Sequence, residues 1–318
     1  MLDLNRSLAM SAGEYDLLTV GELLVDLISA EYGDHHDASV YHKYFGGSPA
    51  NIAMNANKLG IRPQLAAAVG ADGLGKALIR QVRAAGIEPA LIETVEHATS
   101  LVLVTKSRST PVPIFYRGAD YRLSFSPGLE RSLRQSKMMH FSSWPISMQP
   151  SRGTIERMVE IARANGIWIG FDPNYHPMLW PKEEDGVGYI KAMIGKADIV
   201  KPSDDDAERL FGKDSPDNHI RRFLDLGAKL VILTLGKDGA LVSNGKETIR
   251  FPSLAAEVED TTGAGDAFWS GLYAALAQGC VLREAIRTGL AASAFKLKYT
   301  GALADLPRLD ELKARYGI

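Results

Sequence analysis

Residues 137–173 read KMMHFSSWPISMQPSRGTIERMVEIARANGIWIGFDP and contain two short apolar runs, KMMHFSS and IWIGFDP. Between the runs, residues 151–164 carry apolar side chains at the spacing of an amphipathic helix. A strand, a helix and a second strand in this order form a parallel pair, because a parallel connection needs a long crossover. The stretch therefore predicts an α/β fold.

The same alternation extends in both directions along the chain. Further strands are predicted at DLLTVGE, QLAAAVG, ADIVKP and LVILTLG, and further helices at 50–59, 75–85, 203–210 and 218–226. Two stretches, about 31–45 and about 98–125, break the rhythm. In the second, SLVLVTKS and VPIFYRG predict strands with no helix between them. We expect one domain over 12–318, a central mostly parallel sheet flanked by helices, with a small extra sheet at its edge.

Composition limits the possible partners. The chain has 318 residues, 46% of them apolar, which suffices to bury a core. Thirty-six basic and 38 acidic residues give a net charge of −2, so we expect no binding to nucleic acid or to a membrane. Cys280 is the single cysteine, which excludes an internal disulfide and fits a reducing compartment. No apolar run reaches the length of a membrane span, and we expect a cytoplasmic protein.

The strongest local signal is DTTGAGDAFWSGLYAALAQG, residues 260–279. Gly263, Ala264 and Gly265 are small enough for backbone N–H groups to converge at a helix start, where an anion is stabilised. Asp266 would then lie beside that anion, as a base beside a phosphoryl group does. The alternative is that Asp266 only complements the helix dipole.

Other glycine-rich turns give weaker or negative signals. FGGSPANIAMNANKLG, residues 45–60, predicts a helix starting near Pro49, and Asn51 in its first turn either caps the helix or binds a ligand. GADGLGKA, residues 70–77, nearly matches a P-loop, but Ala77 lacks the hydroxyl that Mg²⁺ needs, so we expect an ordinary helix start. TVGELLVD contains only Gly21 and does not match a dinucleotide-binding fingerprint.

Together, GGSPAN and DTTGAGD resemble the two signatures of the PfkB carbohydrate kinase family. VGELLVD, VGADGLG, FDPN, KPSDDDAE and LTLGKDGALV follow in family order, so the resemblance covers nearly the whole chain. It implies a ribokinase-like fold in which the extra sheet is a lid over a sugar. It also implies ATP and Mg²⁺ as cofactors, a small-molecule sugar substrate, and a homodimer through the lid.

The resemblance also implies roles for particular residues. Asp266 resembles the catalytic base, with Gly263, Ala264 and Gly265 as the anion hole. The other implied positions are Asp26, Gly46, Gly47 and Asn51 for sugar, Thr234 and Gly236 for nucleotide, Ser203 and Asp206 for Mg²⁺ and phosphate, and Asp260 and Thr262 for a monovalent cation such as K⁺. Ser203 and Asp206 also fit a capping box, and Asp260 with Thr262 also fits a helix cap.

The acceptor sugar is the least specified feature. FDPNYHPMLWP resembles a D-P-N-x-R element, which makes Asp172 and Asn174 substrate-binding candidates and puts His176 where arginine is usual. A mostly neutral histidine disfavours an acid substrate. Arg117, Tyr116 and Tyr175 are further candidates for contacts with the sugar.

We therefore expect an ATP-dependent kinase that converts fructose to fructose 6-phosphate. A kinase for 2-keto-3-deoxygluconate or 5-dehydro-2-deoxygluconate is one alternative. A non-catalytic sugar-sensing module is the other.

Overall fold

A nine-stranded sheet forms the centre of the computed structural model, which describes residues 2–33, 37–106 and 113–318. Its strands, in spatial order, are β13 (Thr248–Phe251), β12 (Ala240–Ser243), β11 (Leu230–Thr234), β10 (Ile199–Val200), β9 (Trp168–Asp172), β8 (Ser136–Ser142), β1 (Tyr15–Val20), β4 (Pro63–Gly70) and β5 (Ile92–Val95). The strands from β11 to β5 run parallel, and β12 and β13 are antiparallel to their neighbours. The predicted mostly parallel sheet is confirmed, and all six predicted apolar runs fall on its strands.

Helices cover both faces of this sheet. One face carries α1 (Ser48–Leu59), α2 (Gly73–Ala84), α9 (Ala264–Ala277), α10 (Leu282–Lys296) and α11 (Leu309–Tyr316). The other carries α3 (Pro127–Arg134), α5 (Ser151–Ala164), α6 (Gly186–Ile194), α7 (Asp204–Phe211) and α8 (Pro216–Asp225). Successive residues of β1 show why: Leu17 packs into the first layer and Leu18 into the second, as the alternation of a strand requires. Three short turns of helix complete the fold: α4 (Ser143–Ile146), η1 (Pro177–Leu179) and η2 (Gly236–Asp238).

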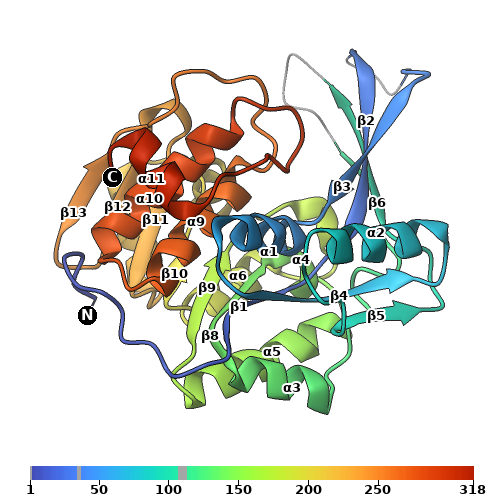
Figure 1. Ribbon diagram of the computed structural model, residues 1–318, viewed down its shortest axis with the longest axis horizontal. Helices are drawn as coiled ribbons and strands as arrows, with labels where there is room; N and C mark the ends of the chain where they lie inside the picture. Colours follow the sequence, from blue (N-terminus) through green and yellow to red (C-terminus); the bar gives the residue numbers. More distant parts are fainter. Residues whose placement is uncertain (1, 34–36, 107–112) are drawn as a thin grey trace.

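A second, four-stranded sheet projects from one end of the molecule (Figure 1). Its order is β3 (Tyr41–Gly46), β2 (Leu24–Tyr32), β6 (Leu101–Lys106) and β7 (Ile114–Tyr116). We call these four strands the lid. The lid begins at Leu24, earlier than the segment expected from about 31, because β2 joins it directly after β1. Within the two expected segments, residues 34–36 and 107–112 lie outside the described residues, including the ends of SLVLVTKS and VPIFYRG.

Pairing registers define the face of the lid that points at the main sheet. Asp26 of β2 pairs with Tyr44 of β3 and with Val102 of β6. Residues directly opposite one another share a face, so these three side chains lie on one side of the lid. Asp26 and Val102 both line a cavity between the lid and the main sheet, which identifies that side as the inner face.

The near-match to a P-loop is an ordinary helix start. Helix α2 begins at Gly73, and the Asp72 carboxylate accepts the Gly75 N–H at 2.8 Å, as an N-cap residue does. No helix in the described ranges combines the length and apolar character needed to cross a bilayer.

Candidate active site

Two adjoining cavities open at the carboxyl ends of the parallel strands. The first, about 410 Å³, lies beneath the inner face of the lid and is lined with polar groups that include Asp26 and Asp266; we call it the polar cavity. The second, about 480 Å³, is lined by Phe268, Leu290 and other apolar side chains; we call it the apolar cavity. Both are lined by Ser203, Thr234 and Gly265, so a ligand can extend from one into the other.

Most residues predicted from the sequence line these cavities. The polar cavity is lined by Asp26, Gly47, Asn51, Asp172, Asn174, Ser203, Asp206, Thr234, Thr262, Gly263, Gly265 and Asp266. Gly236 and Ala264 line the apolar cavity. Gly46, Arg117 and Asp260 line neither of the two.

Helix α9 begins between the cavities with its first N–H groups uncapped by any side chain. Its N-cap residue is Gly263, with φ +73°, a left-handed conformation that favours glycine. A Cβ at this position would lie 2.6 Å from the Ala302 carbonyl oxygen, so glycine is also required for space. The Ala264 N–H donates to the Thr261 carbonyl at 3.2 Å. The other N–H groups of the first turn and the positive end of the helix dipole make this turn, residues 263–265, an anion cradle.

Asp266 lies in the first turn of α9, next to the cradle. One of its carboxylate oxygens accepts from the Ser48 hydroxyl at 2.6 Å, and the other accepts from the Asn51 side-chain N–H at 2.9 Å. Burial raises the pKa of Asp266 to about 6, and the Asp172 carboxylate adds to the increase, while the two hydrogen bonds and Lys201 oppose it. Such a carboxylate is ionised at neutral pH and still basic enough to take a proton from a reacting group.

Asp26 projects into the polar cavity from the lid. Gly46, its diagonal neighbour on β3, has no side chain, and a Cβ there would collide with the Asp26 carboxylate. Burial, together with the negative charge of Asp266, raises the pKa of Asp26 to about 7. The two carboxyl groups therefore interact electrostatically within one cavity, and a ligand with several hydroxyl groups can donate hydrogen bonds to both.

Comparison with known proteins decides what this site belongs to. The model of the pfkB family of carbohydrate kinases matches residues 15–309. The chain belongs to this family. The expected enzyme class is thereby confirmed: the protein is an ATP-dependent carbohydrate kinase that phosphorylates a sugar.

Individual relatives support the assignment to this family. The chain is 54% identical over 318 residues to an ATP-dependent 6-phosphofructokinase of Thermoanaerobacterium thermosaccharolyticum, covering 100% of this chain and 99% of the relative. The structure of Halothermothrix orenii fructokinase superimposes with a TM-score of 0.81 at 40% identity, covering 89% of this chain and 100% of that one. A ribokinase II candidate from E. coli, solved with ATP and Mg²⁺, gives a TM-score of 0.82 at 26% identity over 94% and 98% of the two chains.

Lys201 is a residue of the kinase site that the sequence patterns did not single out. Its ammonium pairs with the Asp172 carboxylate at 3.0 Å, and both side chains are almost fully buried. The Trp269 indole N–H donates to the same Asp172 oxygen at 2.8 Å, which fixes the carboxylate in place. A Cβ on Gly265 would lie 3.4 Å from the Lys201 ammonium, so this positive charge borders the anion cradle.

Glu22 is a second residue that the sequence did not single out. It is 3% exposed, lies between β1 and β2, and accepts the Ser48 backbone N–H at 3.0 Å with one carboxyl oxygen. Burial raises the pKa of Glu22 to about 8, so the group is mostly neutral at pH 7. Gly47, with φ +107°, leaves room for the Glu22 carbonyl, with which a Cβ would collide. Glu22 therefore fixes the start of α1, which supplies both donors to Asp266.

Ser203 and Asp206 form the capping box of α7. The Ser203 hydroxyl accepts the Asp206 N–H at 3.0 Å, and the Asp206 carboxylate accepts the Ser203 N–H at 3.0 Å. The other Asp206 oxygen accepts the Tyr175 N–H at 2.8 Å. Within the described ranges, no group of three or more His, Cys, Asp or Glu side chains could by itself hold a metal ion. Carboxylate oxygens still suit Mg²⁺, which keeps several waters and binds together with substrate phosphates.

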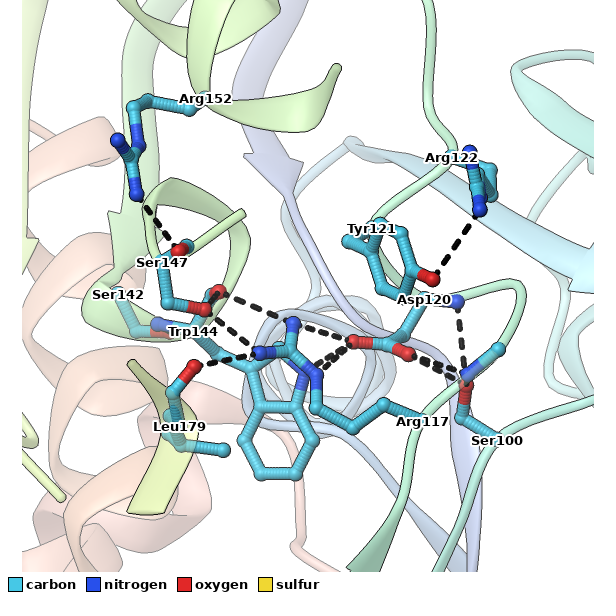
Figure 2. A network of polar contacts seen from close by, with 11 residues as sticks. Ser100, Arg117, Asp120, Tyr121, Arg122, Ser142, Trp144, Ser147, Arg152 and Leu179 are labelled. Atoms are coloured by element: carbon cyan, nitrogen blue, oxygen red, sulfur yellow. Dashed lines mark hydrogen bonds and ion pairs between the residues drawn. The ribbon is translucent and has the colours of Figure 1, made fainter. Parts of the chain in front are cut away.

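Arg117 does not reach the polar cavity. Figure 2 shows its guanidinium pointing at Asp120, to which it donates with two nitrogens at 2.8 and 2.6 Å. Its third nitrogen donates to the Ser147 hydroxyl and the Leu179 carbonyl at 2.7 and 3.0 Å. The expectation that Arg117 contacts a sugar is therefore not supported by its position, because its donors are satisfied within the protein.

The remaining sugar candidates differ in position. Asn174 borders the polar cavity with φ +35°, and its carbonyl accepts from the Ser143 hydroxyl at 2.9 Å. Tyr116 is exposed and lines a groove on the outer face of the lid, away from Asp266. Tyr175 is half-buried, and its backbone N–H donates to the carboxylate of the site residue Asp206. His176 packs edge-on against Phe115 of the lid, with ring centroids 5.1 Å apart.

Proposed function

We propose that the kinase transfers the γ-phosphoryl group of ATP to a primary hydroxyl of a fructose unit, with fructose 6-phosphate as the preferred acceptor. The observation that carries the phosphoryl-transfer chemistry is the position of Asp266 beside the uncapped start of α9. A base and an anion cradle in one turn serve an alcohol that attacks a phosphorus centre.

Each cavity suits one substrate in this proposal. The apolar cavity accommodates the adenosine of ATP, and its phosphates extend over Gly265 toward the anion cradle. The sugar lies in the polar cavity, with hydroxyl groups donating to Asp26 and the attacking hydroxyl facing Asp266. Asp266 takes the proton of that hydroxyl as the new P–O bond forms. Lys201 and the α9 N–H groups stabilise the charge on the transferred group.

Mg²⁺ would be held chiefly by the ATP phosphates, with Asp206 as the nearest candidate among this chain's oxygen ligands. When bound, it neutralises phosphate charge during transfer. The Asp206 oxygens already accept hydrogen bonds from Tyr175 and Ser203, so we propose that its contact with Mg²⁺ runs through water.

The choice of acceptor rests on similarity and on His176, which follows the cavity residue Asn174 in the chain. The relative that is 54% identical over the whole chain is named a 6-phosphofructokinase. His176 lies two residues after Asn174, which borders the polar cavity. Its Nδ1 accepts the Met178 N–H at 3.3 Å, so the neutral ring carries its proton on Nε2 and can donate to a phosphate. Burial lowers the pKa of His176, and the positive charge of Arg209, whose guanidinium donates to the neighbouring Tyr175 carbonyl, also lowers it.

Fructose itself is the second candidate, because a fructokinase structure at 40% identity has the same fold. A coupled assay of ADP release decides between the two. We expect kcat/KM for fructose 6-phosphate to exceed that for fructose by at least about tenfold, a difference of about 1.4 kcal/mol. Ribose, 2-keto-3-deoxygluconate and 5-dehydro-2-deoxygluconate complete the panel. Equal or higher kcat/KM with any of these sugars would overturn the preference for fructose 6-phosphate.

A further inference from the structure

Lys296, the last residue of α10, is a buried cation that the chemistry above does not use. Its side chain is 0% exposed, and its ammonium donates to the backbone carbonyl of Asp260 at 2.7 Å. Enclosing an ammonium is costly unless negative groups compensate it. Burial lowers the pKa of Lys296, and the carboxylates of Asp260 and Asp266 oppose that decrease. The base is therefore within the electrostatic range of this lysine.

Lys296 and its neighbours attach the segment that leads into the anion cradle. The Glu259 N–H donates to the Leu297 carbonyl at 2.7 Å, one residue away from the contact between Lys296 and Asp260. The Gly301 N–H donates to the Asp260 carboxylate at 2.7 Å. The end of α10 and the segment after it thus hold residues 259 and 260 through these three hydrogen bonds. Three residues further along, Gly263 begins the anion cradle.

This arrangement does not fit the monovalent cation expected at Asp260 and Thr262. One Asp260 carboxylate oxygen accepts both the N–H and the hydroxyl of Thr262, at 2.9 and 2.8 Å, and the other accepts the Gly301 N–H. The carbonyl oxygen of Asp260 accepts from the Lys296 ammonium. Every oxygen of Asp260 is thus already paired with a donor of the protein. A bound K⁺ would also meet the positive charge of Lys296.

We propose that the Lys296 ammonium is the built-in cation of the anion cradle: it holds the Asp260 carbonyl in place and supplies the positive charge that a bound K⁺ would supply there. Lys296 is a positioning residue in this proposal, because it touches the loop and not the reacting atoms. The kinase should therefore work without any monovalent metal ion.

The test compares cations at equal ionic strength in the wild type and in Lys296→Met, with Lys298→Met as the matched control because Lys298 is exposed. The wild type and K298M should have the same rate in KCl, NaCl and choline chloride. In choline chloride, kcat of K296M should be at least about tenfold lower than that of the wild type, which corresponds to about 1.4 kcal/mol of transition-state stabilisation. KCl or NH₄Cl should restore most of that loss, since each can replace the missing charge.

A second measurement is independent of the sugar and of the proposed function. Without substrate, KCl should raise the Tm of K296M above its value in choline chloride, and the wild type should show no such difference. Several-fold activation of the wild type by K⁺, full activity of K296M in choline chloride, or an activity loss that no cation restores would each overturn the proposal. If K296M fails to fold, the wild-type comparison of KCl with choline chloride decides alone.

Discussion

The Asp266 carboxylate and the Ser48 hydroxyl lie 2.6 Å apart, although 218 positions separate them in the chain. Ser48 begins α1, directly after the lid strand β3 and Gly47, and Asp266 belongs to the first turn of α9. The contact therefore ties the base to the point where the lid joins the main domain. A hydroxyl donor on a carboxylate also stabilises its charged form, which lowers its pKa.

The pH dependence of activity should report this contact. Because burial raises the pKa of Asp266 to about 6, kcat/KM for the sugar should fall about tenfold per pH unit below that value, as the base becomes protonated. Ser48→Ala removes a donor that lowers the pKa, so the acid limb should move to higher pH. Ser48→Thr keeps the hydroxyl and should stay close to the wild type. Superimposable profiles for S48A and the wild type would contradict the role of Ser48. The titratable or charged groups that act on Asp266 or respond to its charge are Asp172, Lys201, Asp26, Glu22 and Lys296, and Asn51 also donates to Asp266.

Glu22 should make stability depend on pH. Its pKa in the folded protein is about 8, above the ordinary 4.5, so the folded state holds a proton that the unfolded state releases. The associated stability is fully present below pH 4.5 and is lost as pH rises through 8. The glutamine of Glu22→Gln cannot titrate. The free energy of unfolding of E22Q minus that of the wild type should therefore increase by at least about 1 kcal/mol from pH 5 to pH 8.5. Urea unfolding at the two pH values measures this, and a constant difference between the proteins would refute it.

Gly46 should matter for the sugar and not for the nucleotide. Alanine at this position would press its methyl group on the Asp26 carboxylate and displace it. We expect Gly46→Ala to raise KM for the sugar at least about tenfold and to change KM for ATP less than about twofold. Gly73→Ala is the matched control, because no atom lies within 4 Å of the added Cβ. Equal changes in both KM values would argue against a sugar contact by Asp26.

The Arg117–Asp120 pair should be important for stability. Asp120 is 0% exposed, and besides Arg117 it accepts the Trp144 indole N–H at 2.6 Å, which joins the base of the lid to the main domain (Figure 2). Asp120→Ala leaves the Arg117 charge without its carboxylate and should cost about 3–5 kcal/mol of unfolding free energy. Glu130→Ala breaks the more exposed pair with Arg134 and should cost at most about 1 kcal/mol. Equal costs in denaturant unfolding would contradict this contrast.

Local sequence patterns predicted the parallel strands and the glycine-rich turn well. Apolar runs such as LVILTLG are buried on both faces, and a covered parallel sheet produces that pattern. The extent of the lid was less predictable. Leu24 and Val25 are both buried at the start of β2, so they resemble a core strand, and the change of direction occurs at Gly21, where φ is +152°.

Buried charged residues could not be predicted because their partners are distant in the sequence. Lys296 bonds Asp260, 36 positions away. Lys201 pairs with Asp172 on the neighbouring strand, and Glu22 bonds Ser48 across 26 positions. Arg117 shows the same limit in reverse. Its sequence context allowed either a contact with the sugar or a place on the surface, and the three-dimensional arrangement pairs it with Asp120 only three residues away.

The most direct test of the account is the turnover of Asp266→Asn. Asparagine preserves the shape and can still accept from Ser48, but it cannot take a proton from the sugar hydroxyl. We predict a kcat at least about 10²-fold below the wild type, with an unchanged Tm and ATP affinity. A kcat within a few-fold of the wild type in a folded, ATP-binding variant would show that Asp266 is not the base.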